Sequence, residues 1–170
     1  MASGSLRTGV SLAKGLGMAL DIPLIPVSTP DAMVHTLQKT DGILAAAIDG
    51  KNGTLYFAEY MCRNGIVEKA VPEMVLKAGE SGYRRPGYAH VVGWGVDRYE
   101  GMLNNIYADG IELRKLDILL VGGALVHIAH GMLYDTKPVS AAAFIPRYLR
   151  EPDAKTKKRI KVVYEKDSAV

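Results

Sequence analysis

The sequence predicts an α/β fold, and three features carry that prediction. Residues 43–48 form a continuous apolar run that is typical of a buried strand. Residues 49–53 carry the Asp, Asn and Gly residues of a hairpin turn, after which residues 54–61 return as a second strand. The apolar residues of segments 6–20 and 116–134 have helical spacing. Helices that flank a sheet of this kind place the chain in the α/β class.

The helix predicted at residues 6–20 is apolar on two faces. One stripe contains Leu6, Val10, Ala13, Gly17 and Leu20, and a second contains Leu12, Leu16 and Ala19. Polar side chains are confined to a narrow strip of Arg7, Ser11 and Lys14. A helix of this kind must be covered on two sides, and its own sheet can cover only one. Dense packing within the chain and a subunit interface explain the second face equally well.

The next segment carries helix-start chemistry. Residues 23–27 are expected to form a short strand with a proline at each margin. Ser28 supplies a capping hydroxyl, Pro30 suits the first helical turn, and Asp31 lies near the positive end of the helix dipole. A helix is therefore expected directly after Ser28.

The later elements complete a single α/β domain over residues 1–150. We expect a short helix at residues 71–76, a strand at residues 89–93, and a further helix capped by Asp97. A chain of 170 residues can bury one sizeable core. Residues 151–170 are polar and basic, so a flexible tail is expected there.

Composition is that of an ordinary globular protein, with 48% hydrophobic and 23% charged residues. The net charge of +3 is mild and does not by itself indicate a nucleic-acid partner. Cys62 is the single cysteine, which excludes an internal disulfide and fits a reducing, cytoplasmic location. No apolar run reaches the roughly 20 residues of a membrane span, so no membrane contact is expected.

Few residues have the spacing of a metal or catalytic site. The four histidines are dispersed and lack a cysteine pair or an HExxH motif, so no metal is expected; they are His35, His90, His127 and His130. No nucleophile elbow, Walker motif or GxGxxG turn occurs. Asp49 is the best single carboxylate for acid–base work, but a turn-forming aspartate is the simpler explanation.

Basic residues interleaved with tyrosines are candidates for a nucleotide or RNA contact. They are Arg84, Arg85, Arg147, Arg150 and the lysines of residues 155–161, with Tyr83, Tyr88 and Tyr148. Basic tails are often only solvated, so we expect at most an accessory RNA contact. Arg84, Arg85 and Arg150 stay, together with Asp49, as weak candidates for the nucleotide or RNA side.

Five segments, in order, resemble the bacterial TsaB (YeaZ) family. Residues 6–16 (LRTGVSLAKGL) align without a gap to the family segment LRxGLATAKGL. The likeness continues within residues 22–28 and resumes within residues 47–56, which are similar to a family strand pair. Residues 93–95 (GWG) resemble a family turn, and residues 146–150 (PRYLR) resemble its terminal P-x-Y-L-R. The family's opening strands and Gly-rich loop have no counterpart, so we expect a chain that lacks the N-terminal part.

The resemblance implies an actin-like, Hsp70-like (ASKHA) fold, mainly its second lobe plus one helix of the first. It implies a non-catalytic scaffold that binds a TsaD-type catalytic subunit, which acts with a TsaE-type ATPase in threonylcarbamoylation of tRNA adenosine 37. No cofactor is then expected in this chain, because ATP or ADP would act at the level of the complex, which also contacts the tRNA. The expected partner surface is Leu6, Arg7, Val10, Ala13, Lys14 and Gly17.

Two other interpretations stay open. The chain could be a nucleotide-binding actin-like enzyme or a peptidase-like remnant, although no phosphate loop or nucleophile supports an enzyme. It could also be a self-associating module, a homodimer in which the first helix pairs with its own copy.

Overall fold

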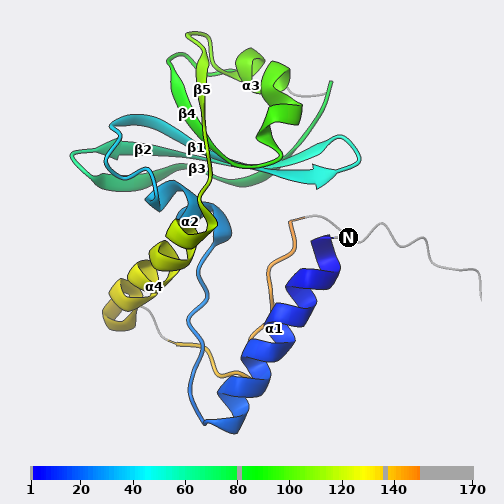
Figure 1. The fold of residues 1–170 in the computed structure, drawn as a ribbon, viewed down its shortest axis with the longest axis vertical. Helices are drawn as coiled ribbons and strands as arrows, with labels where there is room; N and C mark the ends of the chain where they lie inside the picture. Colours follow the sequence, from blue (N-terminus) through cyan, green and yellow to red (C-terminus); the bar gives the residue numbers. More distant parts are fainter. Residues whose placement is uncertain (1, 80–81, 136–137, 150–170) are drawn as a thin grey trace, which may run out of the picture.

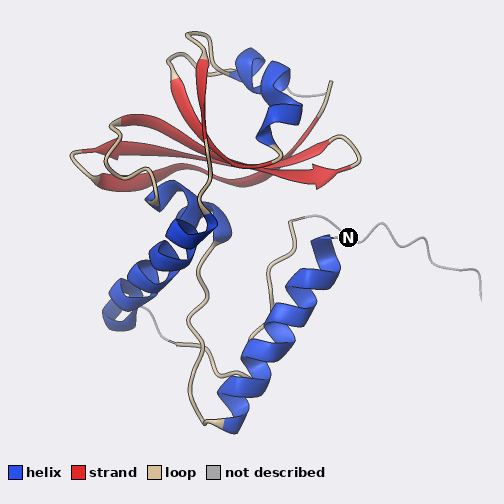
Figure 2. Cartoon of the chain, viewed as in Figure 1, coloured by secondary structure: helices blue, strands red, loops and turns tan. Residues whose placement is uncertain are grey.

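A five-stranded mixed sheet forms the centre of the chain, with helices on both faces (Figure 1, Figure 2). The computed structural model describes residues 2–79, 82–135 and 138–149. The strands, which lie in the order β3-β2-β1-β4-β5, are β1 (Gly42–Lys51), β2 (Thr54–Arg63), β3 (Ile66–Lys77), β4 (Ala89–Trp94) and β5 (Ile111–Arg114). β1, β2 and β3 form an antiparallel meander, whereas β4 runs parallel to β1, and β5 parallel to β4. The predicted α/β class is confirmed.

Both hairpins of the meander have the turn chemistry that the sequence indicates. Asn52 and Gly53, with φ values of 51° and 73°, join β1 to β2, and Lys51, the last residue of β1, has a φ of 65°. Asn64 and Gly65, with φ values of 51° and 78°, join β2 to β3 as a two-residue turn. Positive φ at both central residues matches the right-handed twist of the strands.

The prediction of a helix at residues 71–76 is wrong, because this segment belongs to β3. Pro72 lies on an edge strand, where its missing N–H costs no hydrogen bond to a further strand. The register of β3 on β2 also shifts beside Pro72, opposite Phe57 and Glu59. Pairing along most of β2 therefore outweighs the local helix-start signal of one proline. β5 was not expected either.

The core has two layers of side chains, one on each face of the sheet. On one face, residues of β1, β2 and β4 pack against the 3-10 helix η1 (Val96–Tyr99) and α3 (Glu100–Ile106). On the other face they pack against α2 (Thr29–His35) and α4 (Ile118–Asp135). Cys62 is buried on this second face, as expected for a structural thiol. α4 confirms the helix expected at residues 116–134.

Three local predictions need correction. Ser28 occupies the N-cap position of α2, but its hydroxyl donates to Glu73 instead of capping the helix. Asp97 lies inside η1, and the N-cap is Gly95 in the left-handed region, with φ 73°. The strand expected at residues 23–27 is reduced to one bridge between Leu24 and Val139, because no longer strand lies beside it in the described part of the chain.

Helix α1 (Ala2–Ala19) stands apart from the sheet and lies beside the segment that follows α4 (Figure 1). The expectation that its own sheet would cover one face is therefore wrong. The chain leaves α1 along residues 20–28 and returns to it along residues 139–149, so two connections join α1 to the sheet. Among the described residues, no helix combines the length and apolarity needed to cross a membrane.

We predict that Gly93→Ala prevents correct pairing of β1 with β4. A Cβ at Gly93 would overlap the carbonyl oxygen of Ala47, which is backbone and cannot move aside. The expected loss of unfolding free energy is at least ~3 kcal/mol, measured by urea denaturation. Gly101→Ala is the matched control, since a Cβ there meets nothing within 4 Å and the site is helical. Equal stability of the two variants would contradict the assigned register.

Candidate functional site

One face of α1 is covered by the chain itself. Gly17 is buried, and a Cβ there would lie 2.9 Å from the Cβ of Ala141. The Nζ of Lys14 donates to the carbonyl oxygens of Ala142 and Phe144 at 3.1 and 3.0 Å. Val10 and Ala13 are half-buried, and their spacing places them on the same helix face. Residues 141–144, and not the sheet, therefore cover this face of α1.

This packing divides the six residues of the expected partner surface. Val10, Ala13, Lys14 and Gly17 lie on the covered face, whereas Leu6 and Arg7 are exposed. The free apolar face is instead the second stripe of the sequence, where Leu12 is 65% and Leu16 52% exposed. The sequence contains both stripes, but the covering residues lie more than a hundred positions away. Periodicity alone could not tell which stripe they cover.

A second apolar surface lies on the outer side of α4. Val121 and Ala124 are buried in the cluster that α4 forms with α2 and one face of the sheet. The exposed apolar residues of α4 are Ile118, Leu119, Leu120, Leu125, Val126 and Leu133. Leu119 is 82% exposed, the most of any large apolar side chain of the two long helices. The described chain thus presents two unpaired apolar helix faces.

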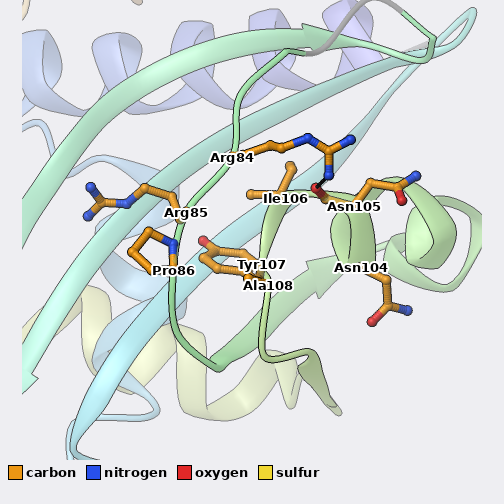
Figure 3. A pocket seen from close by; sticks show the side chains of 8 residues that line it. All are labelled: Arg84, Arg85, Pro86, Asn104, Asn105, Ile106, Tyr107 and Ala108. Atoms are coloured by element: carbon orange, nitrogen blue, oxygen red, sulfur yellow. Dashed lines mark hydrogen bonds between the residues drawn. The ribbon is translucent and has the colours of Figure 1, made fainter.

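Arg84 and Arg85 lie at a shallow hollow of about 360 Å³ between their loop and the end of α3 (Figure 3). Arg84 is exposed, and its Nη1 donates to the carbonyl of Asn105 at 2.8 Å. The side-chain amides of Asn104 and Asn105 also line the hollow. This arrangement could bind an anion or the edge of a base, but Arg84 is the one exposed basic side chain among the residues that line the hollow.

Arg85 has a structural role, because its guanidinium pairs with a buried carboxylate instead of being free for a ligand. Its Nη2 lies 2.6 Å from Oε1 of Glu59, a carboxylate that is fully buried on β2. The hydroxyl of Tyr107 donates to the other oxygen of Glu59 at 2.8 Å, and the hydroxyl of Tyr83 does so at 3.4 Å. Burial and the Glu59 carboxylate raise the pKa of Tyr107, which keeps it a donor. The network ties the loop of Arg85 to the sheet.

Asp49 stabilises the turn between β1 and β2, which is the simpler of the two explanations that the sequence offers for this residue. It accepts hydrogen bonds from the backbone N and Nζ of Lys51 at 2.8 and 2.7 Å and from the hydroxyl of Tyr99 at 2.9 Å. The hydrogen bond from the Lys51 side chain is the main cause that lowers the pKa of Asp49 to about 2. A carboxylate held ionised in this way is a poor general base near neutral pH. Arg150, the remaining candidate, lies outside the described residues.

The histidines do not assemble a metal site in the part of the chain that the structure describes. His127 of α4 stacks on His35 of α2, with ring centroids 5.0 Å apart. Burial and the neighbouring His127 lower the pKa of His35, which favours the neutral form of His35. No group of three His, Cys, Asp or Glu side chains in the described ranges is arranged to hold a metal ion.

Glu73 of β3 collects cations and a hydroxyl from three segments. Its Oε1 accepts from Ser28 at 2.6 Å and from Lys69 at 2.8 Å, and its Oε2 pairs with Arg147 at 2.7 Å. Lys69 also pairs with Asp31, whose other contact is the hydroxyl of Tyr60. Burial raises the pKa of Glu73, but the hydrogen bonds from Lys69 and Ser28 outweigh it and lower the pKa to about 2.

Comparison with known proteins identifies the family. Residues 2–92, more than half of the chain, match the family model described as TsaD: tRNA N6-adenosine threonylcarbamoyltransferase. The tRNA threonylcarbamoyladenosine biosynthesis protein TsaB of Escherichia coli (strain K12) is 31% identical over 152 residues, which are 85% of this chain and 64% of that protein. The TsaB of Bacillus subtilis (strain 168) is 35% identical over 68 residues, 40% of this chain and 30% of that protein. The chain belongs to the TsaB (YeaZ) family.

Solved structures of TsaB (YeaZ) relatives support the fold. YeaZ from Pseudomonas aeruginosa superposes with a TM-score of 0.63 at 21% identity, over 84% of this chain and 67% of that one. A protein described as similar to peptidase YEAZ from the same organism gives 0.64 at 22% identity, over 85% and 67%. These neighbours have the actin-like ASKHA fold, so the predicted fold is confirmed. The chain spans less than two thirds of either TsaB relative.

We predict that Glu73→Gln removes part of the acid sensitivity of this chain. A carboxylate whose pKa is lowered from 4.5 to about 2 by folding stabilises the native state above pH 4.5. That contribution is lost as the pH falls from 4.5 towards 2, so the stability gap between the two proteins should narrow over this range. Asp49 titrates in both proteins and cancels from the difference.

The measurement is urea denaturation at several pH values between 2 and 7. Glu68→Gln is the matched control, because Glu68 is an exposed carboxylate on the same strand. A gap for Glu73→Gln that stays constant with pH would contradict the lowered pKa.

Proposed function

We propose that this chain is a non-catalytic subunit that binds a TsaD-type catalytic subunit in threonylcarbamoylation of tRNA adenosine 37. The support from comparison is membership of the TsaB (YeaZ) family and the names of its two TsaB relatives. The single structural observation that carries the proposal is the uncovered apolar stripe of α1. We assign the partner surface to Leu12, Leu16 and Ala19, opposite the face that the chain covers.

The chemistry of this stripe suits a helix-packing partner. Full burial of one leucine side chain stabilises an assembly by about 1.5–3 kcal/mol relative to exposure. Gly15 lies between Leu12 and Leu16 and carries nothing within 4 Å of its Cβ position, so a partner helix can approach closely. Arg7 is exposed, but its helical spacing places it with Ser11 and Lys14 rather than beside this stripe, so we do not assign it to the partner surface.

The remaining expectations follow from the same proposal. Nucleotide chemistry lies with the TsaD-type subunit and a TsaE-type ATPase, and this chain holds no cofactor. The tRNA is contacted through the complex, with Arg84 at its hollow as an accessory contact of this chain. The assembly works in the cytoplasm.

A homodimer is the second candidate, and the same stripe favours it. An apolar helix face that is free on one copy is free on every copy, so two α1 helices can pair about a two-fold axis. A partner subunit and a second copy then compete for one surface. We therefore expect the homodimer to dissociate when the TsaD-type subunit binds.

We predict that Leu16→Asp strongly weakens binding of a TsaD-type subunit while the chain stays folded. Leu16 is 52% exposed, so the substitution leaves the intrachain contacts of α1 intact. A buried, unpaired carboxylate in the interface should cost at least ~3 kcal/mol, about a hundredfold in Kd. Isothermal titration calorimetry and light scattering measure affinity and mass.

Leu119→Asp is the matched control, because it makes the same change on the exposed face of α4. Wild-type affinity of Leu16→Asp would overturn the assignment of the α1 stripe. Loss of binding in Leu119→Asp alone would assign the partner surface to α4 instead.

A further inference from the structure

Glu73 is the point at which both connections to α1 meet the sheet. The outgoing connection, residues 20–28, ends at Ser28, whose hydroxyl donates to Oε1 of Glu73. The returning segment covers α1 and then carries Arg147, whose guanidinium pairs with Oε2 of the same carboxylate. Each oxygen of one side chain thus holds one of the two connections.

The surroundings of Glu73 favour a fixed geometry. Its side chain is 8% exposed, whereas that of Arg147 is 68% exposed. Lys69, which lies four residues away on the same strand, also donates to Oε1, so the two cations balance Glu73 and the neighbouring Asp31. Charge-assisted hydrogen bonds to a shielded carboxylate are short and directional. The flexible partner is Arg147, which must be ordered to reach the carboxylate.

The unit that these contacts hold contains the proposed partner surface. Lys14 and Gly17 attach α1 to residues 141–144, and the paired backbones of Leu24 and Val139 attach the two connections to each other. α1 and these residues therefore move together as one unit. The orientation of this unit relative to the sheet depends on the contacts that Ser28 and Arg147 make with Glu73. Helix α1 itself lies away from the sheet (Figure 1).

We propose that Glu73 is a positioning residue that latches the α1 unit to the edge strand of the sheet and so sets the orientation of the partner surface. The inference rests on the proposed function only where it concerns the partner. Without the latch, α1 samples several orientations, and only a fraction of the molecules presents the stripe in the orientation that binds. The apparent Kd rises by the inverse of that fraction.

The test measures the orientation directly, on the full chain without a partner. Spin labels are attached at Ser11→Cys on α1 and Glu100→Cys on α3, both exposed positions, while the native Cys62 is buried, which raises the pKa of its thiol. Double electron–electron resonance then reports the distribution of distances between the two labels. We expect one narrow distribution in the parent chain and a broad one in Glu73→Ala and in Arg147→Ala.

A double-mutant cycle separates the latch from a general loss of stability. Once Glu73 is removed, removal of Arg147 should add no further broadening, because the ion pair of Arg147 with Glu73 is already lost. Glu68→Ala is the matched control on the same strand and should keep the narrow distribution. Arg147→Ala changes an exposed side chain, so it remains informative if Glu73→Ala fails to fold.

Affinity for a TsaD-type subunit gives the second readout. Both latch variants should bind about tenfold more weakly, with no change in the melting temperature of Arg147→Ala. A narrow distribution in both variants overturns the latch, whatever the affinity. Broad distributions with Leu16→Asp still binding normally overturn the proposed partner surface and leave the latch standing.

Discussion

The parallel pairing of β1 with β4 is the contact on which the rest of the structure depends. It joins the antiparallel meander to β5, and it places a backbone carbonyl of Ala47 where only a glycine, Gly93, can face it. The small side chains of residues 45–47 are buried on both faces of β1. They allow α3 and η1 on one side, and α2 on the other, to lie close to the sheet. One strand thus fixes the sheet order and both helical layers.

Buried carboxylates fix the parts that hydrophobic packing does not. Glu59 binds the loop of Arg85, Asp49 closes the first hairpin, and Glu73 gathers the connections to α1. In each case a cation and a hydroxyl satisfy the carboxylate, which avoids the large cost of an unpaired buried charge. This use of charge explains why most candidate functional residues of the sequence prove to be structural. Arg85 and Asp49 have the residue types of a site, but their charges are already engaged.

The sequence was sufficient for elements that local chemistry determines. The apolar run of β1, the turn within residues 49–53 and the long apolar helix α4 were all expected from composition and spacing. The sequence was insufficient where contacts with distant residues determine the structure of a segment. β3 forms because β2 offers it a full partner, despite Pro72, and the covered face of α1 is chosen by residues 141–144. Local patterns contain no information about contacts across such separations.

The position of α1 away from the sheet means that contacts outside the core set the orientation of the partner surface. A helix packed on the sheet would present a stripe with a fixed orientation, because core packing resists deformation. Here α1 is covered by the segment that follows α4, and polar contacts at the sheet edge govern its orientation. These contacts lie outside the two hydrophobic clusters, so they set a geometry without altering the packing of the core. A partner that packs on Leu12 and Leu16 therefore meets a surface whose orientation the contacts of Glu73 set, and loss of those contacts changes that orientation without any change in the core.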